Sequence, residues 1–161
     1  MAVLLYRVDE RLIHGQVVIG WGTGLDPDRI VVVDDELAAS TWEQELYTLG
    51  LPEDVAASFE SVDRARAALA DWAGNGERIL LLTRDLATMR RVGAGGLLKG
   101  REVNIGGIHH APGREKVLPY VFLGAAERDE IRALVRDGAR VVARDLPAAR
   151  GVTAPELLGE D

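Results

Sequence analysis

Two short runs of the sequence are apolar without interruption, and they limit the possible folds more than any other feature. Residues 30–33 read Ile-Val-Val-Val, and residues 79–82 read Ile-Leu-Leu-Leu. A strand without polar alternation suits a parallel sheet that is buried on both faces. Further apolar stretches occupy residues 3–8, 55–59, 102–105 and 140–143. Segments of helical character separate them, so the sequence predicts an α/β fold: a doubly wound, mostly parallel open sheet with helices on both faces.

The segments between these strands carry helix signals of different quality. Either Asp34 or Asp35 can cap a helix in which Leu37, Trp42, Leu46 and Leu49 fall on one face, and Gly50 and Pro52 end this helix. A helix that begins at Gly15 is expected to fray in the glycine-rich stretch 20–24, with Trp21 in the core. Residues 117–123 contain Pro119 and predict an edge strand or an irregular extension.

Length and patterning predict a single domain with a tail. The chain has 161 residues, of which 47% are hydrophobic, enough for a sizeable core. Ordered patterning ends near Pro147, so we predict a domain at residues 1–147 and an exposed acidic C-terminal tail at 148–161. No apolar run approaches the ~20 residues that a membrane helix needs.

Charge and residue usage exclude several classes of function. The formal net charge is −7, which argues against nucleic acid as a partner, and the absence of cysteine excludes disulfides and thiolate metal sites. No group of residues has metal-ligand spacing, so we expect no metal and no cofactor. The N-terminus lacks the basic region of a signal peptide, and we therefore expect a cytoplasmic protein.

The polar stretch after the first predicted strand is the main candidate site. His14 stands where the strand gives way to the next helix, with Asp9 and Arg11 a few residues before it. In an open parallel sheet this is a carboxyl-end loop, where ligands bind. The N–H groups of Gly15 and Gln16, at the beginning of the helix, can face an anion. A neutral imidazole beside an anion cradle indicates a residue that takes and passes on a phosphoryl group.

Other polar or glycine residues at strand ends could serve either the site or the fold. Thr83 can donate its hydroxyl to a phosphoryl group or cap the helix after it. Asn104 is favoured as a turn residue, and Gly106-Gly107 as a tight turn with positive φ. His109 and His110 are adjacent and have no third metal ligand nearby, so we treat them as loop residues beside the site.

Residues 7–17, Arg-Val-Asp-Glu-Arg-Leu-Ile-His-Gly-Gln-Val, resemble the active-site loop of a known family. This family is the IIB component of the mannose/fructose/sorbose class of the bacterial phosphoenolpyruvate:sugar phosphotransferase system. Trp21, the strand and acidic turn at 30–36, the Asn-Ile-Gly-Gly segment at 104–107 and the ending at 123–147 are similar in the same order. The resemblance extends from Ala2 to Pro147.

The resemblance implies a reaction and a set of partners. A IIB component accepts a phosphoryl group from the phosphohistidine of its IIA partner and gives it to a sugar bound by the membrane IIC/IID components. His14 matches the phosphorylated histidine, and Nδ1 is the expected atom. Arg11 would neutralise the phosphoryl oxygens, since its guanidinium offers a planar fork of donors. Asp9 is expected to hold the loop or Arg11 rather than the phosphoryl group, and the protein to meet the inner face of the membrane through IIC/IID.

Two further functions remain open at this stage. One is a regulatory phosphocarrier that signals its phosphorylation state to a partner protein without sugar transport. The other is an anion- or nucleotide-binding module, which is disfavoured because the chain has no glycine-rich nucleotide fingerprint. The sequence names no sugar, and it leaves open whether the chain forms a homo-oligomer.

Overall fold

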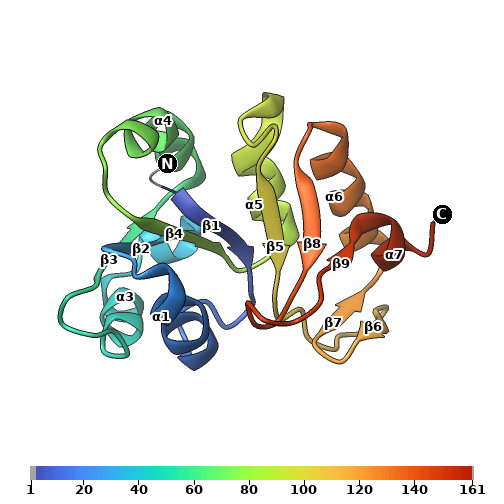
Figure 1. Cartoon of the computed structure of the whole chain (residues 1–161), viewed down its shortest axis with the longest axis horizontal. Helices are drawn as coiled ribbons and strands as arrows, with labels where there is room; N and C mark the ends of the chain where they lie inside the picture. The colour runs from blue at the N-terminus through green and yellow to red at the C-terminus, as the bar shows by residue number, and fades with distance from the viewer. Residues whose placement is uncertain (1–2, 161) are drawn as a thin grey trace.

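One seven-stranded sheet forms the centre of the computed structural model, which describes residues 3–160 (Figure 1). Residues 1–2 and 161, at the ends of the predicted domain and tail, lie outside the described residues. The strands are β1 (Val3–Val8), β2 (Arg29–Val33), β3 (Ala56–Glu60), β4 (Ile79–Thr83), β5 (Glu102–Ile105), β8 (Arg140–Ala143) and β9 (Val152–Thr153). Their order is β3-β2-β4-β1-β5-β8-β9, and neighbours are parallel except β9 beside β8. The predicted fold class is confirmed.

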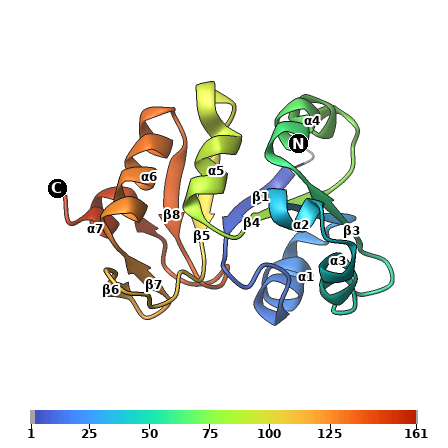
Figure 2. The ribbon, with the colours of Figure 1, turned by 180° about the vertical axis from the view of Figure 1, so that it is seen from behind.

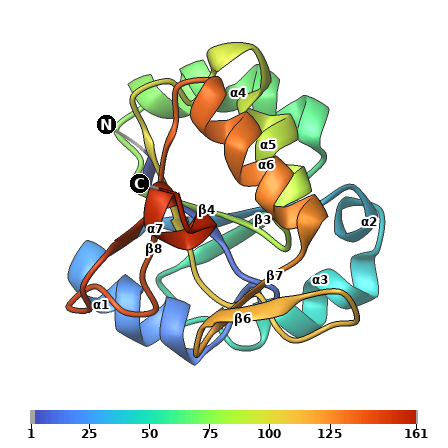
Figure 3. The same ribbon diagram turned by 90° about the vertical axis from the view of Figure 1, so that its right-hand side faces the viewer.

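Helices cover both faces of this sheet and complete two separate apolar cores (Figure 3). They are η1 (Gln16–Trp21), α1 (Gly22–Leu25), α2 (Asp35–Ala38), α3 (Thr41–Thr48), α4 (Val62–Gly74), α5 (Leu86–Gly93), η2 (Ala94–Gly96), α6 (Ala125–Arg136) and α7 (Ala154–Leu158). One layer contains α4, α5 and α6, with α5 and α6 side by side (Figure 2), and the other contains η1, α1 and α3. None of the helices within residues 3–160 is long and apolar enough to cross a membrane.

The order of the strands places one crevice at the middle of the sheet. From β1 the chain first moves to β2 and β3 on one side, returns through β4, and then continues to β5 and β8 on the other. Val8, the last residue of β1, lies opposite Thr83 of β4 and Ile105 of β5. The loops after β1, β4 and β5 therefore meet at a topological switch point, where ligands of such sheets bind.

The acidic turn after β2 begins a broken helix rather than one continuous helix. Asp34 is the cap, because its side chain accepts the N–H of Leu37, whereas Asp35 accepts the N–H of Val62. The helix stops after α2, and α3 begins a new one.

Trp42, Leu46 and Leu49 are exposed whereas Leu37 is buried in a separate helix, so the predicted single face that joins all four is wrong. Leu37 is buried because it belongs to α2. The break between α2 and α3 changes the direction of the chain, so the apolar side of α3 does not lie on the same face as Leu37. The inward side of α3 instead carries Gln44, which donates to Leu37 O at 2.7 Å, and Tyr47, whose ring meets Phe59.

The helix after His14 continues through residues 20–24, where the glycines had predicted that it would fray. Its first part, η1, is a wide π-helix that passes directly into α1, and Asp26 ends the pair with a left-handed φ of 49°. At Gly20 the side chain of Leu146 packs closely on the helix, and a Cβ at this position would lie 2.6 Å from it, so Leu146 would have to shift. Gly20 thus allows a close contact and does not end the helix, and Trp21 is buried as predicted.

Two regions near the C-terminus differ from the expected structure. Residues predicted as one edge strand form a separate antiparallel hairpin, β6 (Glu115–Leu118) with β7 (Val121–Leu123), because Pro119 lies in the turn between them. The segment after Pro147 was predicted as an exposed tail, and this is wrong for its described part. It adds β9 to the sheet and packs α7 against β8, with Val152, Ala154 and Leu157 buried. Three apolar residues, widely spaced, were too few to show this in the sequence.

Replacement of Leu157 with alanine tests whether this segment belongs to the folded domain. The side chain is almost fully buried in the core, so we expect the free energy of unfolding to fall by about 2–5 kcal/mol in a urea titration. Leu49→Ala is the control, since 82% of that residue is exposed, and it should change stability by less than about 0.5 kcal/mol. Equal effects of the two substitutions would contradict the packing of α7.

Candidate functional site

The loop after β1 is tied to both neighbouring strands. Asp9 N–H donates to Thr83 O at 3.0 Å, and Glu10 N–H donates to Gly107 O at 2.9 Å. The chain then turns sharply, because Leu12 has a left-handed φ of 56° and its N–H donates to Asp9 O. Such a conformation costs a bulky residue on the order of 1–3 kcal/mol. Complete burial of the Leu12 side chain in the η1–α3 core offsets this strain.

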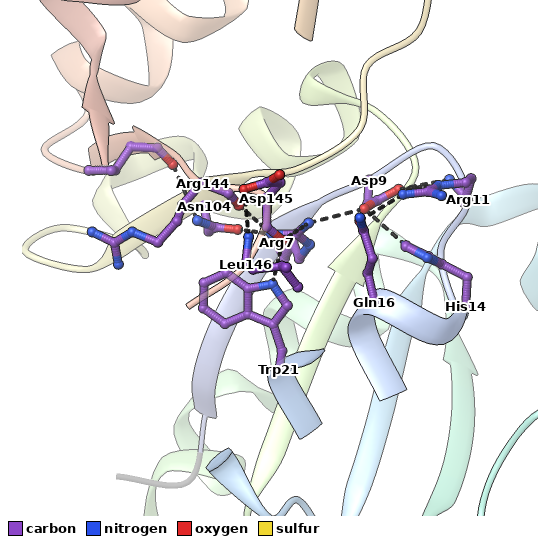
Figure 4. A network of polar contacts seen from close by, with 11 residues as sticks. Arg7, Asp9, Arg11, His14, Gln16, Trp21, Asn104, Arg144, Asp145 and Leu146 are labelled. Carbon is purple, nitrogen blue, oxygen red and sulfur yellow. Dashed lines mark hydrogen bonds and ion pairs between the residues drawn. The ribbon is translucent and has the colours of Figure 1, made fainter. Parts of the chain in front are cut away.

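This turn brings His14 back over Asp9 (Figure 4). His14 Nε2 lies 3.0 Å from Asp9 Oδ2, and the side chain of His14 is 15% exposed while that of Asp9 is fully buried. In the neutral ring, Nε2–H donates to the carboxylate, which leaves the lone pair on Nδ1. The geometry thus selects a tautomer and frees one ring nitrogen for reaction.

Asp9 is the hub of the loop. Besides His14 it accepts the N–H of Arg11 at 3.1 Å and a guanidinium N–H of Arg7 at 3.3 Å. Burial alone would raise the pKa of Asp9, but the Arg11 N–H and the charges of His14 and Arg7 together bring this pKa below its usual value. Asp9 is therefore an ionised carboxylate that bonds to His14 and Arg11 of the loop and to Arg7 of β1.

Arg7 is a fully buried arginine beneath this hub. Its Nη1 donates to Asn104 Oδ1 and, at 2.8 Å, to the carbonyl of Arg144, while Nη2 donates to the carbonyl of Asp145 at 3.1 Å. The guanidinium also lies over the ring of Trp21, 5.1 Å from its centroid. Burial lowers the pKa of Arg7, and the charge of Asp9 opposes this. Arg7 thus joins β1, β5, η1 and the chain after β8 at one point.

Sequence reasoning assigned no role to Arg7, although one signal was available. A charged residue inside an otherwise apolar strand must be paired if the strand is buried. Two of its four hydrogen-bond partners are backbone carbonyls after β8, and carbonyls carry no sequence signal. Gly106 belongs to the same arrangement: it has no positive φ, contrary to prediction, and is required because a Cβ there would collide with the guanidinium of Arg7.

Arg11 lies on the open side of the loop. Its side chain is 46% exposed, donates to Gln16 Oε1 at 2.8 Å and is 3.7 Å from Asp9 Oδ1. Gly15 and Gln16 occupy the first turn of the helix, where backbone N–H groups lack intrahelical acceptors. His14, Arg11, Gly15 and Gln16 are therefore brought together as predicted.

Thr83 and Asn104 lie beside the loop but are engaged elsewhere. Thr83 is completely buried, its hydroxyl donates to Asp85 O at 2.9 Å, and Asp85 rather than Thr83 caps α5. Asn104 accepts from Arg7 and donates weakly to Val142 O, so it holds strands together rather than a turn.

The two adjacent histidines point in different directions. His109 N–H donates to Glu10 Oε1 at 2.7 Å, and its ring lies near the position of Gly107. The ring of His110 packs edge-on against Phe122, with centroids 5.7 Å apart. Within residues 3–160 no group of three or more potential ligands is arranged to hold a metal ion.

Burial is the largest cause of a lowered pKa at His14. The charge and hydrogen bond of Asp9 oppose the shift, and the positive charges of Arg11 and Arg7 add to it. The net pKa lies below the ordinary value of 6.5, so the ring is neutral at and somewhat below neutral pH.

A parallel α/β domain that presents a neutral histidine at its switch point has the arrangement that phosphoryl transfer requires. The family model described as "PTS system sorbose subfamily IIB component" matches residues 3–161. The chain therefore belongs to this family of sugar phosphotransferase subunits. The match includes the segment that we had expected to lie outside the domain.

Named relatives and solved structures agree with this assignment. The N-acetylgalactosamine-specific phosphotransferase enzyme IIB component 1 of Escherichia coli K12 is 26% identical over 157 residues, covering 96% of this chain and 97% of the relative. The mannose-specific EIIAB component of the same strain is 32% identical across 98% of this chain, which spans about half (47%) of that longer protein. The crystal structure of manxB from Thermoanaerobacter tengcongensis is 30% identical with a TM-score of 0.84, covering 98% and 95% of the two chains.

The titration of His14 tests the electrostatics of this site. We expect an NMR titration of its ring signals to give a midpoint below 6.5, and Asp9→Asn to lower it further, because the carboxylate opposes the effect of burial. The unfolded chain binds a proton near pH 6.5 and the folded chain only below it, so this group makes the fold less stable as pH falls through that interval. His14→Ala identifies the signals, and a midpoint at or above 6.5 would contradict the described environment.

Proposed function

We propose that this chain is the phosphoryl carrier of a sugar-transporting phosphotransferase system. His14 accepts a phosphoryl group from the phosphohistidine of a IIA protein and passes it to a sugar bound by the membrane IIC/IID components. The observation that carries this proposal is the contact between Asp9 Oδ2 and His14 Nε2 at 3.0 Å. It leaves Nδ1 as the nucleophilic atom of a ring that is already neutral.

The first transfer uses this tautomer. The lone pair of His14 Nδ1 forms the new N–P bond while the N–P bond of the IIA phosphohistidine breaks, and the electron pair of that bond returns to the IIA imidazole. The proton on His14 Nε2 stays in its bond to Asp9, so the positive charge that develops on the ring meets a carboxylate. Such positioning and charge stabilisation are what phosphoryl transfer requires from a protein.

Arg11 and the first helical turn would hold the transferred oxygens. The Arg11 side chain is 46% exposed and its contact with Gln16 Oε1 lies at the surface, so its guanidinium can exchange that oxygen for a phosphoryl oxygen. The N–H groups of Gly15 and Gln16 add neutral donors. Thr83 contributes through its carbonyl, which holds Asp9, because its hydroxyl is already bonded to Asp85.

The second transfer returns the site to its starting state. A sugar hydroxyl attacks phosphorus, the His14 N–P bond breaks with its electron pair returning to Nδ1, and the hydroxyl proton passes to water as the P–O bond forms. This step takes place on the cytoplasmic side of the membrane, where the sugar is delivered by the permease. No metal or cofactor is part of the proposed chemistry.

Replacement of the histidines tests which of them carries the phosphoryl group. We expect one added phosphoryl group in intact-mass spectra under alkaline conditions, after incubation with phosphoenolpyruvate, the general phosphotransferase proteins and a IIA protein. The addition should be absent in His14→Ala, because only His14 has a ring nitrogen bonded to Asp9. His109→Ala combined with His110→Ala is the control and should be phosphorylated normally. Phosphorylated His14→Ala would refute the assignment.

A second substitution tests the charge stabilisation. Arg11→Ala should slow transfer to His14 by about 3 kcal/mol in barrier, the scale of losing one such donor, and Arg11→Lys should restore part of the rate. Thermal stability should change little because Arg11 is largely exposed. Arg140→Ala, at an exposed position of β8, is the matched control. A rate for Arg11→Ala equal to that of the control would remove Arg11 from the mechanism.

A further inference from the structure

The outer side of α3 is apolar although nothing in the described chain covers it. Trp42, Leu46 and Leu49 are 66%, 58% and 82% exposed, and together they form what we call the α3 face. They recur at helical spacing, so they share one side of the helix. An open groove beside them, between α3 and β3, is lined by Leu49, Phe59 and Glu45 among others. Contiguous exposed apolar residues of this kind mark interaction sites.

The α3 face belongs to a segment with an unusual charge. Residues 30–63 contain nine acidic residues and no lysine or arginine, whereas the rest of the chain has 17 acidic and 19 basic residues. The net negative charge of the protein is therefore carried by this segment. Arginines of other elements pair with some of these acids, namely Asp34, Asp35 and Glu60. Glu45, Glu53 and Asp54 are exposed and have no ion pair within residues 3–160.

This charge decides among the possible occupants of the face. Two copies related by a twofold axis would bring the same acids together, and like charges across an interface oppose association. An anionic lipid surface would repel the face for the same reason. A protein surface with an apolar centre and a rim of lysine and arginine fits both features. Cytoplasmic loops of membrane proteins carry such an excess of basic residues.

The position of the face is also suited to such a partner. The helix α3 lies in the same layer as η1, the helix that begins just after His14 (Figures 1 and 3). Tyr47 of α3 packs in the same core as Val17 and Trp21 of η1. A partner that covers this layer is therefore held rigidly with respect to the histidine loop.

We infer that the α3 face, with its acidic rim, is the docking surface for the basic cytoplasmic surface of the membrane permease. This inference rests on the proposed function and adds to it the surface that binds the permease. Docking at the α3 face is separate from acceptance of the phosphoryl group, which needs only the histidine loop. The two can therefore be measured independently.

The experiment compares two face variants with two matched controls. Leu46→Lys places a charge on the apolar centre, and Glu45→Lys reverses the acidic rim. Val135→Lys and Asp71→Lys make the same changes at exposed positions of α6 and α4, in the opposite layer. Binding is measured by co-sedimentation with phosphatidylethanolamine/phosphatidylglycerol vesicles that contain the IIC and IID components, and with the same vesicles without protein. Acceptance of a phosphoryl group from IIA and the thermal midpoint are measured for every variant.

We expect both face variants to bind the permease vesicles about tenfold more weakly, the scale of losing an interface anchor, while both controls bind like the wild type. Binding of the wild type should weaken with added salt, and protein-free vesicles should bind nothing. Phosphorylation of His14 and thermal stability should be unchanged in all four variants.

Other results would overturn the inference and would say what the face does. Unchanged binding of the face variants would exclude the face as a permease site, even though the proposed function would stand. Loss of acceptance from IIA would assign the face to IIA, and a wild-type dimer that Leu46→Lys dissociates would assign it to self-association. Binding to protein-free vesicles would make the partner lipid. Failure of the wild type to be phosphorylated would instead refute the proposed function itself.

Discussion

The buried guanidinium of Arg7 is the interaction on which the rest of the site depends. A charge in the interior must be paired, and removal of a partner from a buried pair costs roughly 3–5 kcal/mol. The two terminal nitrogens of Arg7 are bonded to the side chains of Asp9 and Asn104 and to the carbonyls of Arg144 and Asp145, whereas its Nε has no hydrogen-bond partner in the described part of the chain. Those contacts bind the chain after β8 to the base of the histidine loop. The orientation of His14 therefore depends on residues more than 120 positions away in sequence.

A chain of contacts leads from this charge to the reactive nitrogen. Arg7 helps to keep Asp9 ionised, Asp9 holds His14 Nε2, and the hydrogen bond leaves Nδ1 available. The left-handed Leu12 and the short bonds to Thr83 and Gly107 give the loop one conformation. Catalytic groups held in this way need little reorganisation when charge develops. The left-handed backbone of Leu12 lowers the stability of the fold, and the burial of its side chain in the core offsets this cost.

The histidine loop and the α3 face with its acidic rim lie on different parts of this domain. The histidine loop carries Arg11 at its surface, whereas residues 30–63, from the second residue of β2 through α3 to the beginning of α4, contain no lysine or arginine. Opposite local charges on one small domain can select different partners for different steps. In the proposed function a phosphoryl donor would meet the loop, and a basic partner would meet the α3 face.

The sequence by itself determined the fold class and most of the histidine loop. Uninterrupted apolar strands can be satisfied only inside a parallel sheet, and the loop residues Asp9, Arg11, His14, Gly15 and Gln16 are neighbours along the chain. Only the tertiary structure decided the role of Arg7, the use of Gly106 and the packing of residues 152–158, because their partners are distant and are often backbone carbonyls. It also decided which side of α3 faces outward. The apolar periodicity there is clear, but a helix break at residues 39–40, invisible to periodicity, turned that stripe toward solvent.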